Sequence, residues 1–343
     1  MRELVIVIAD LYLPPESGRT GAPRRSPAAP AVSLPAIEDL TRFARVQPLR
    51  DGWRDWVARW LRIAPYAGWP PASVAAAAVP DVPPGRACWL ATPLHLTESL
   101  AGLHLDLGGV LCLGRAQREQ LAADFNRELG DCGFALAGLE SGEFLLSGPE
   151  GIQAQTTEPA RLPVASVAES LPTGTGAPAL RRLGAEIEMW LYDHPLNRER
   201  ARRGEAPVST LWIWGGGLCP IRRDPAAVPA ARIFGSGAWL AGLCRLTGIP
   251  AGPEPETLPA VSGDEPTLAV LEIGARLRTD PGRSVAAALA GVDARLIGPA
   301  CAALRSGELG RLTLIANDRA WTLRASDRWR LWRRRRAALE ALA

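Results

Sequence analysis

Lysine is absent from this 343-residue sequence, in which all 39 basic residues are arginine. A GC-rich coding sequence accounts for this bias, because alanine, proline and glycine are also in excess over average usage. The chemical consequence holds whatever the cause. A Schiff-base lysine, a P-loop lysine and a lysine general base are all excluded.

Histidine is nearly as scarce, with His95, His104 and His194 as the only three and none after the last of them. A two-metal phosphotransfer site holds its ions about 4 Å apart with side chains such as aspartate and histidine. Three scattered imidazoles argue against a zinc-type site with several histidine ligands. A site made of carboxylates alone, for Mg²⁺ or Mn²⁺, stays open.

Cysteine is sparse too, and its six residues include no CxxC pair. In a chain of this length the pattern indicates reduced, mostly buried thiols. The apolar run 4–9 is too short for a signal peptide, and we expect no stretch of the roughly 20 apolar residues that a membrane helix needs. We therefore expect a cytoplasmic protein without a membrane partner. The net charge of +3 is too small to indicate nucleic-acid binding.

Hydrophobic residues make up 47% of the chain, which is a globular composition. The run 4–9 is rich in β-branched residues and predicts a strand buried on both faces of a parallel sheet. That strand delivers Asp10 to its carboxyl end, where α/β proteins place their chemistry. Further strands are expected at 210–214, 232–234 and 268–273, and a hairpin at 312–324. The fold class predicted is α/β with a mostly parallel central sheet flanked by helices.

The domain organisation follows from the proline- and glycine-rich breaks. Residues 1–70 and 179–343 are predicted to form the α/β core domain. Residues 87–157, with short strands around one amphipathic helix, are predicted to form an inserted α+β subdomain. Linkers are expected at 71–86 and 158–178, and a mobile Pro/Ala-rich loop at 14–35.

A polar cluster lies where a helix over 179–192 ends in a turn. Its members are candidate ligand-binding residues: Glu186, Asp193, His194, Asn197 and Arg198. The functional interpretation is that Arg198 orients a phosphate or carboxylate. The structural alternative is a helix terminus at which the dipole favours His194 and Asn197 closes the turn.

Three consecutive glycines, Gly215, Gly216 and Gly217, follow the predicted strand 210–214. Such a run allows the close backbone approach that an anion-binding loop requires. A tight turn between two elements is the alternative interpretation.

The C-terminal segment is strongly basic, with ten arginines between Arg305 and Arg336. A helix is expected from about Ser326. Its candidate partner-binding residues are Trp329, Trp332, Arg333, Arg334, Arg335 and Arg336. They suit an acidic protein or a nucleic-acid backbone, while a solvated terminal helix is the alternative.

The block 180–217 resembles the signature of the RpfE-type regulatory proteins, a phosphoglycerate-mutase-like group. The matching positions are Glu186, Met189, His194, Pro195, Asn197, Arg200, Trp212, Trp214 and the three glycines. The segment 327–336 is similar to that group's C-terminus. The wider relatives implied are the archaeal-type cofactor-independent phosphoglycerate mutases of the alkaline phosphatase-like superfamily, so the resemblance implies a reduced form of that fold.

Those enzymes use two divalent metals, held by aspartates and histidines, and a serine that is transiently phosphorylated. By this resemblance Asp10 takes the place of the first metal-binding aspartate, but Leu11 replaces the glycine that usually follows. The nucleophile serine has no matching context, and the late histidine ligands are missing. Asp10 and His194 are the candidate catalytic residues, and Asp10 is the candidate metal ligand.

The leading hypothesis is therefore a non-catalytic, phosphoglycerate-mutase-like regulatory or scaffolding protein that binds a macromolecular partner, expected to be a protein, without a cofactor. One alternative is a Mg²⁺- or Mn²⁺-dependent phosphoglycerate mutase or phosphoesterase with a diverged site. Another is an accessory subunit of a nucleic-acid-processing enzyme that uses the arginine-rich C-terminal helix.

Overall fold

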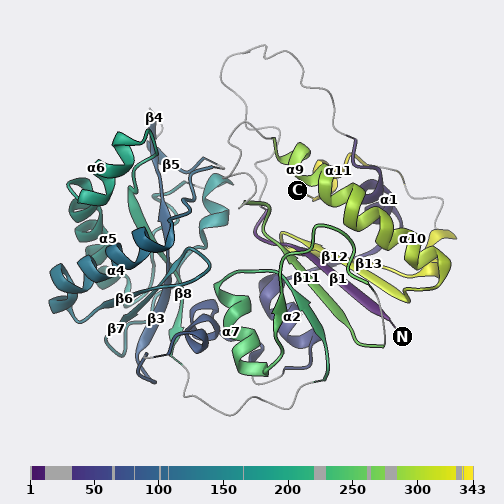
Figure 1. Ribbon diagram of the computed structural model, residues 1–343, viewed down its shortest axis with the longest axis horizontal. Helices are drawn as coiled ribbons and strands as arrows, with labels where there is room; N and C mark the ends of the chain where they lie inside the picture. The colour runs from purple at the N-terminus through teal and green to yellow at the C-terminus, as the bar shows by residue number, and fades with distance from the viewer. Residues whose placement is uncertain are drawn as a thin grey trace. The chain divides into compact units, whose positions relative to one another are not determined.

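The computed structural model describes residues 2–11, 33–63, 66–80, 82–99, 102–106, 108–164, 166–219, 229–260, 264–274, 284–329, 334 and 336–342. The chain divides into two compact units (Figure 1). The first unit comprises Met1–Leu61, Pro229–Gly235 and Ile249–Ala343, and the second comprises Arg62–Val228 and Ser236–Gly248.

The first unit is built on a seven-stranded sheet. In spatial order its strands are β10 (Ala251–Gly252), β9 (Arg232–Phe234), β11 (Thr267–Leu271), β1 (Glu3–Ile8), β12 (Arg311–Ala316), β13 (Arg319–Leu323) and β2 (Arg45–Pro48). Neighbours from β10 to β12 are parallel, and β13 and β2 continue the sheet in antiparallel pairing. The predicted mostly parallel central sheet is confirmed.

The β1 strand lies at the centre because both of its faces are apolar. Leu4, Ile6 and Ile8 are completely or almost completely buried in one cluster with the helices of one sheet face. Figure 1 shows α2 on the opposite face from α1, α9 and α10. The helices of this unit are α1 (Pro35–Phe43), α2 (Gly52–Trp60), α9 (Val285–Val292), the π-helical η6 (Asp293–Ile297), α10 (Gly298–Ser306), the 3-10 helix η7 (Ala325–Trp329) and α11 (Ala338–Leu342).

A buried carboxylate joins two helices of this face. Helix α1 has Leu34 at its N-cap, which offers no side-chain acceptor to the first amides. Asp293 supplies it from η6, accepting from the amides of Ile37 at 2.6 Å and Ala36 at 3.3 Å. Burial raises the pKa of the Asp293 carboxyl, and these two hydrogen bonds oppose the rise.

The helical run Val285–Ser306 is, among the described residues, long and apolar enough by length and composition to cross a membrane. The expectation that no stretch approaches this length is therefore wrong. In the sequence Asp293 and Arg295 interrupt the apolar pattern, but in the structure the helix continues through them. In the first unit this run packs apolar side chains such as Leu289 and Leu296 into the sheet's core cluster.

The second unit contains a four-stranded antiparallel sheet. Its spatial order is β6 (Ala135–Gly138), β7 (Phe144–Gly148), β3 (Ala87–Leu94) and β8 (Thr210–Leu218). A separate hairpin is formed by β4 (Thr97–Ser99) and β5 (Gly102–His104). The helices are α3 (Pro71–Ala75), η3 (Ala76–Ala78), α4 (Arg115–Glu128), η4 (Gly130–Cys132), η5 (Pro159–Val164), α5 (Ala177–Tyr192), α6 (Pro195–Arg202) and α7 (Ala238–Thr247).

Alternate side chains of β3 pack into two different apolar clusters, because successive side chains of a strand point to opposite faces of the sheet. Trp89 packs with α4 and α5, and Leu90 packs with α3 on the other face. Helix α3 also lies against α7, where a Cβ added at Gly242 would collide with the carbonyl oxygen of Val74. Glycine is therefore required for the close approach of these two backbones.

The observed units differ from the predicted domains. Residues 179–228, assigned from sequence to the core domain, belong to the second unit, because β8 pairs along β3. The segment 71–86, expected to be a linker, contains helix α3, which is buried from Ala72 to Ala75. The segment 158–178 contains η5 and buried Leu162. Most of the predicted loop 14–35 lies outside the described residues.

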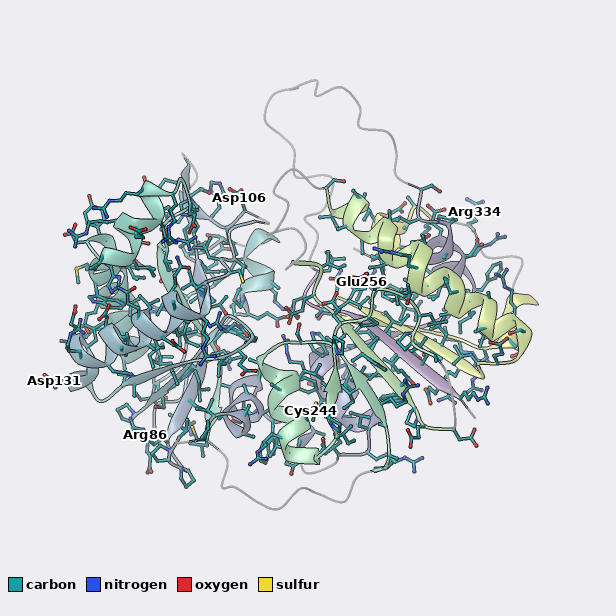
Figure 2. All side chains as sticks on the ribbon, in the orientation of Figure 1. Arg86, Asp106, Asp131, Cys244, Glu256 and Arg334 are labelled. Atoms are coloured by element: carbon teal, nitrogen blue, oxygen red, sulfur yellow. The ribbon has the colours of Figure 1, made fainter. Side chains whose placement is uncertain are left out.

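The predicted C-terminal helix is interrupted. Residues 325–329 form a 3-10 helix, and residues 334, 336 and 337 are not helical. Asp327 fixes the short turn, because its buried carboxylate accepts from the amide of Arg324 at 3.0 Å. Arg334, labelled in Figure 2, and Arg336 are exposed. Trp332, Arg333, Arg335 and the side chain of Trp329 lie outside what the structure describes.

The contact between α3 and α7 gives a test of the packing. Changing Gly242→Ala should destabilise the second unit by about 1–3 kcal/mol, because the new methyl group meets backbone that has no rotamer to change. The matched control is Gly184→Ala in α5, where an added Cβ meets nothing within 4 Å. That change should stabilise by about 0.5–1 kcal/mol, through helix propensity. Urea unfolding measures both. Equal effects of the two substitutions would contradict the packing described.

Candidate functional site

Asp10 follows β1 at the carboxyl end of the parallel strands, where the sequence predicted it. Its backbone has a φ of 54°, a left-handed conformation that aspartate tolerates better than most residues. Both carboxylate oxygens are engaged by helix α2 of the same unit. The indole of Trp53 donates to Oδ1 at 2.8 Å, and Nη2 of Arg54 lies 2.6 Å from Oδ2.

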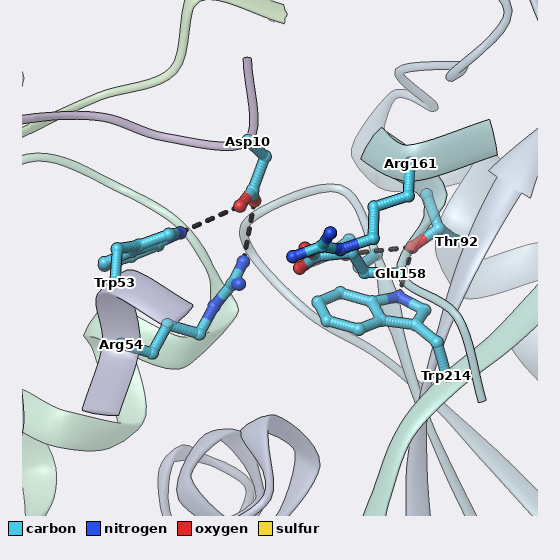
Figure 3. A network of polar contacts seen from close by, with 8 residues as sticks. Asp10, Trp53, Arg54, Thr92, Glu158, Arg161 and Trp214 are labelled. Carbon is cyan, nitrogen blue, oxygen red and sulfur yellow. Dashed lines mark hydrogen bonds and ion pairs between the residues drawn. The ribbon is translucent and has the colours of Figure 1, made fainter. Parts of the chain in front are cut away.

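The two donors are arranged as one assembly. In Figure 3 the Trp53 indole and the Arg54 guanidinium both point to the Asp10 carboxylate. The guanidinium also lies over the Trp53 ring, 4.5 Å from its centroid. The side chain of Arg54 is 16% exposed and that of Asp10 is 30% exposed, so solvent screens this pair only in part. The carboxylate expected to bind a metal thus has a cation from its own chain against it.

The described residues around Asp10 do not make up a two-metal centre. Such a centre needs several oxygen or nitrogen ligands that converge on each ion. In the part of the chain that the structure describes, no group of three or more His, Cys, Asp or Glu side chains is placed to hold a metal ion. A divalent ion at Asp10 would also be repelled by the guanidinium of Arg54.

His194 is buried in the second unit and begins helix α6. Its Nδ1 accepts from the amide of Leu196 at 3.1 Å, so the ring's proton is on Nε2 when the ring is neutral. Nε2 lies 3.3 Å from Oδ2 of Asp124, without hydrogen-bond geometry. The edge of the ring meets Trp190, with 4.6 Å between centroids. Burial lowers the pKa of His194, and Asp124 and Glu128 oppose the shift.

Asn197 and Arg200 hold the chain that leads from α6 into β8. The amide of Asn197 donates to the carbonyls of Leu191 at 2.7 Å and Val208 at 2.9 Å, and its oxygen accepts from Val208 at 2.8 Å. Nε of buried Arg200 donates to the carbonyl of Ala206 at 2.7 Å. These hydrogen bonds agree with the structural alternative, in which the side chains of His194 and Asn197 stabilise a turn.

The remaining members of the predicted cluster lie apart from this buried turn. Asp193 and Arg198 are exposed. Glu186 lies six residues before the end of α5 and pairs with Arg182 at 2.9 Å. The structure therefore brings together His194 and Asn197 but not the whole set. Whether any of them contacts a ligand stays a prediction.

The three glycines lie inside strand β8 rather than after its end. Gly217 pairs with Cys88 of β3, and a register shift follows between Cys88 and Leu90. A Cβ at Gly216 would collide with the Trp89 ring, and a Cβ at Gly217 would collide with the Ser73 hydroxyl.

The amide of Gly215, which has a φ of 66°, donates to the hydroxyl of Thr156 at 3.0 Å. The turn predicted for the three glycines is therefore wrong. These positions are glycine because side chains distant in sequence pack against this backbone.

A second polar network, on β3 and β8, was not among the predicted sites. The hydroxyl of Thr92 donates to Glu143 at 2.9 Å and accepts from the indole of Trp214 at 2.9 Å. Figure 3 draws the Thr92–Trp214 pair, together with the ion pair between Glu158 and Arg161, which are 3.1 Å apart. The alternation of Trp212 and Trp214 along a strand was the one signal available, since tryptophan indoles buried in a sheet need acceptors.

No protein-family model matches the chain. A stretch of 55 residues is 38% identical to a probable 2,3-bisphosphoglycerate-independent phosphoglycerate mutase of Geobacter sulfurreducens, covering 16% of this chain and 14% of that protein. The chain thus matches only a small part of that relative's length.

Two solved structures are similar over most of their length. A cofactor-independent phosphoglycerate mutase of Thermoplasma acidophilum aligns over 93% of this chain and 88% of its own, with 16% identity and a TM-score of 0.36. A Pyrococcus horikoshii protein aligns over 94% and 87%, with 15% identity and a TM-score of 0.43. Similarities this low assign neither an activity nor a family to the chain.

The Asp10 assembly predicts a loss of stability in Asp10→Asn. Asparagine keeps the shape, tolerates the left-handed backbone and still accepts from Trp53, but it places an uncharged amide against Arg54. We expect a loss of about 1–2 kcal/mol, given the partial exposure. The measurement is urea unfolding, with Asp131→Asn as control because Asp131 is exposed (Figure 2). A loss no greater than that of the control would show that the ion pair is not formed.

The burial of His194 predicts a pH dependence. Its pKa is lowered on folding, so the neutral ring's contribution is complete above the ordinary value of 6.5 and is lost as pH falls below it. His194→Asn keeps an N-cap acceptor and removes the titration. Between about pH 7.5 and about pH 5, wild type should lose more unfolding free energy than the variant. Parallel curves for the two proteins would contradict this account.

Proposed function

We propose that the chain is a non-catalytic, phosphoglycerate-mutase-like protein with a regulatory or scaffolding role, and that it acts by binding a macromolecular partner. The observation that carries the proposal is the engagement of both Asp10 oxygens by Trp53 and Arg54. In a metal-dependent phosphotransferase this carboxylate would be held ready for a divalent cation. Here a guanidinium neutralises it instead.

The phosphoglycerate-mutase part of the proposal is supported by the 55-residue similarity to the Geobacter sulfurreducens protein. The finer assignment, to the RpfE-type regulatory proteins, rests on the motif residues of the block 180–217. In this chain several of those residues have structural partners that account for their identity: His194, Asn197, Arg200 and the three glycines. A protein retaining these residues without a metal-ligand set would keep the scaffold of the enzymes and lose their chemistry.

The partner-binding part rests on the sequence of the arginine-rich tail. Arg334 and Arg336 are exposed, which suits contact with carboxylates or phosphates through bidentate hydrogen bonds. Residues 334 and 336 are not helical, so these two arginines are presented by an irregular segment. A protein partner, and a cytoplasmic location, remain predictions.

The proposal predicts no phosphoglycerate mutase activity with Mn²⁺, Mg²⁺, Co²⁺ or Zn²⁺. The assay follows interconversion of 2- and 3-phosphoglycerate by the purified full chain. Asp131→Asn serves as a preparation control, and Asp10→Ala shows whether any turnover depends on the proposed site. Turnover above background that is lost in Asp10→Ala would establish the enzyme alternative, with Mg²⁺ or Mn²⁺ as its cofactor.

A second arm tests the partner. Arg333, Arg334, Arg335 and Arg336 are changed together to serine, and capture from lysate is compared with wild type at low and high salt, with and without nuclease. We expect salt-sensitive capture that survives nuclease and is lost in the variant. Capture that disappears with nuclease would favour the nucleic-acid-processing alternative, and capture equal to wild type would show that the tail does not bind the partner.

A further inference from the structure

Two cysteines meet across the pairing of β3 and β8. Cys88 lies opposite Gly217, and Cys219 follows one residue after β8 ends. The pairing continues past that end, because the amide of Cys219 donates to the carbonyl of Arg86 at 2.8 Å and its carbonyl accepts from Gly85 at 3.0 Å. Cys219 is thus the diagonal neighbour of Cys88 on the same face of the sheet.

Both side chains are buried in the apolar cluster that includes α3. Cys88 is 0% and Cys219 is 3% exposed. Each thiol is the largest influence on the pKa of the other. Two buried thiols on one face of neighbouring strands, each acting on the other, are placed to join in a disulfide once their side chains turn toward each other. The sequence could not indicate this pair, because 130 residues separate the two positions.

The two thiols are not equivalent. The mutual hydrogen bond, reinforced by burial, raises the pKa of the Cys88 thiol. The same hydrogen bond lowers the pKa of the Cys219 thiol, and the charge of Arg86 lowers it further, against the effect of burial. Cys219 is therefore the thiol of the pair that loses its proton more readily, and the thiolate is the nucleophilic form of cysteine.

Arg86, labelled in Figure 2, is the cation whose charge favours a thiolate at Cys219. Its Nη2 donates to the carbonyl of Gly133 at 2.6 Å, but its Nε is buried without a hydrogen-bond partner. A buried donor of a charged group is costly unless an anion compensates it. A thiolate at Cys219 would offset part of that cost through its charge.

We propose that Cys88 and Cys219 form a redox-active dithiol that a small hydroperoxide oxidises to a disulfide. The Cys219 thiolate attacks one peroxide oxygen, the O–O bond breaks, and the departing oxygen takes up a proton, which leaves a sulfenic acid on Cys219. The Cys88 sulfur then attacks the Cys219 sulfur, the S–S bond forms, and the hydroxyl leaves with the Cys88 proton as water. Two thiols lose two electrons and two protons, and one hydroperoxide is reduced.

A small hydroperoxide suits this site better than a bulky disulfide does. An exchange with a bulky disulfide would leave a large thiol attached to Cys219. That group would have to fit beside side chains that are almost completely buried. The resulting disulfide would fix the edge strand β8 to β3 close to the register that the structure shows. This inference is independent of the proposed function.

The experiment uses the full chain with the exposed Cys112 and Cys132 changed to serine. The reduced protein is treated with hydrogen peroxide, quenched, alkylated in denaturant and mapped by mass spectrometry. We expect a peptide linking Cys88 to Cys219, while Cys244 and Cys301 stay alkylated. Those two are internal controls, because burial raises the pKa of each to about 11.

Variants assign the order of the steps. In Cys88→Ser, Cys219 should accumulate as a sulfenic acid that a cyclic dione traps. In Cys219→Ser, Cys88 should oxidise no faster than Cys244. Arg86→Gln should slow disulfide formation several-fold and leave the same link.

The proposal is overturned if no Cys88–Cys219 link forms by the time Cys244 oxidises, or if Cys88 becomes the sulfenic acid first. If a cysteine variant fails to fold, the proposal is tested by the oxidation rate of Cys219 relative to that of Cys244 in the parent protein. A rate no faster than that of Cys244 counts against the proposal.

Discussion

The carboxylate of Asp10 is held between the guanidinium of Arg54 and the indole of Trp53, at the carboxyl end of the central strand β1. This contact fixes α2 against the sheet edge where parallel α/β proteins place their chemistry. It also neutralises the negative charge of Asp10 at that edge. A carboxylate with a cation of its own chain 2.6 Å away is a poor ligand for a divalent metal, because the metal would have to displace the guanidinium or tolerate its repulsion. The interpretation of the protein as non-catalytic depends on this one ion pair more than on any missing residue.

Most of the elements that the sequence predicted correctly are local in origin. The β-branched run of β1 and the hairpin of β12 and β13 were expected, because strand periodicity is visible in a few residues. Helices α4 and α5 were expected because the periodicity of a helix is also visible in a short stretch of sequence. Prediction from the sequence failed where the composition of a segment is typical of a linker but the segment forms a helix. Helix α3 lies in a stretch rich in proline and alanine that looks like a linker, but its small side chains allow the approach of Gly242 in α7.

The candidate site was harder to predict because its contacts are non-local. Asp10 was placed correctly at a strand end, but nothing in the sequence pairs it with Arg54, 44 residues later. The glycines of β8 suggested a phosphate-binding turn, whereas Trp89 and Ser73 explain two of them by packing. His194 and Asn197 form hydrogen bonds within a turn, as the structural alternative stated, and such residues can serve the scaffold instead of a reaction. The sulfur pair of Cys88 and Cys219 exists only through the register of two strands.

The central claim is that Arg54, and not a divalent metal, neutralises Asp10. The most direct measurement is the metal content of the purified full chain by elemental analysis, followed by titration with Mn²⁺. The account predicts no stoichiometric divalent metal as purified and no saturable Mn²⁺ site that depends on Asp10. One or two equivalents of tightly held metal, lost together with the binding isotherm in Asp10→Ala, would contradict it.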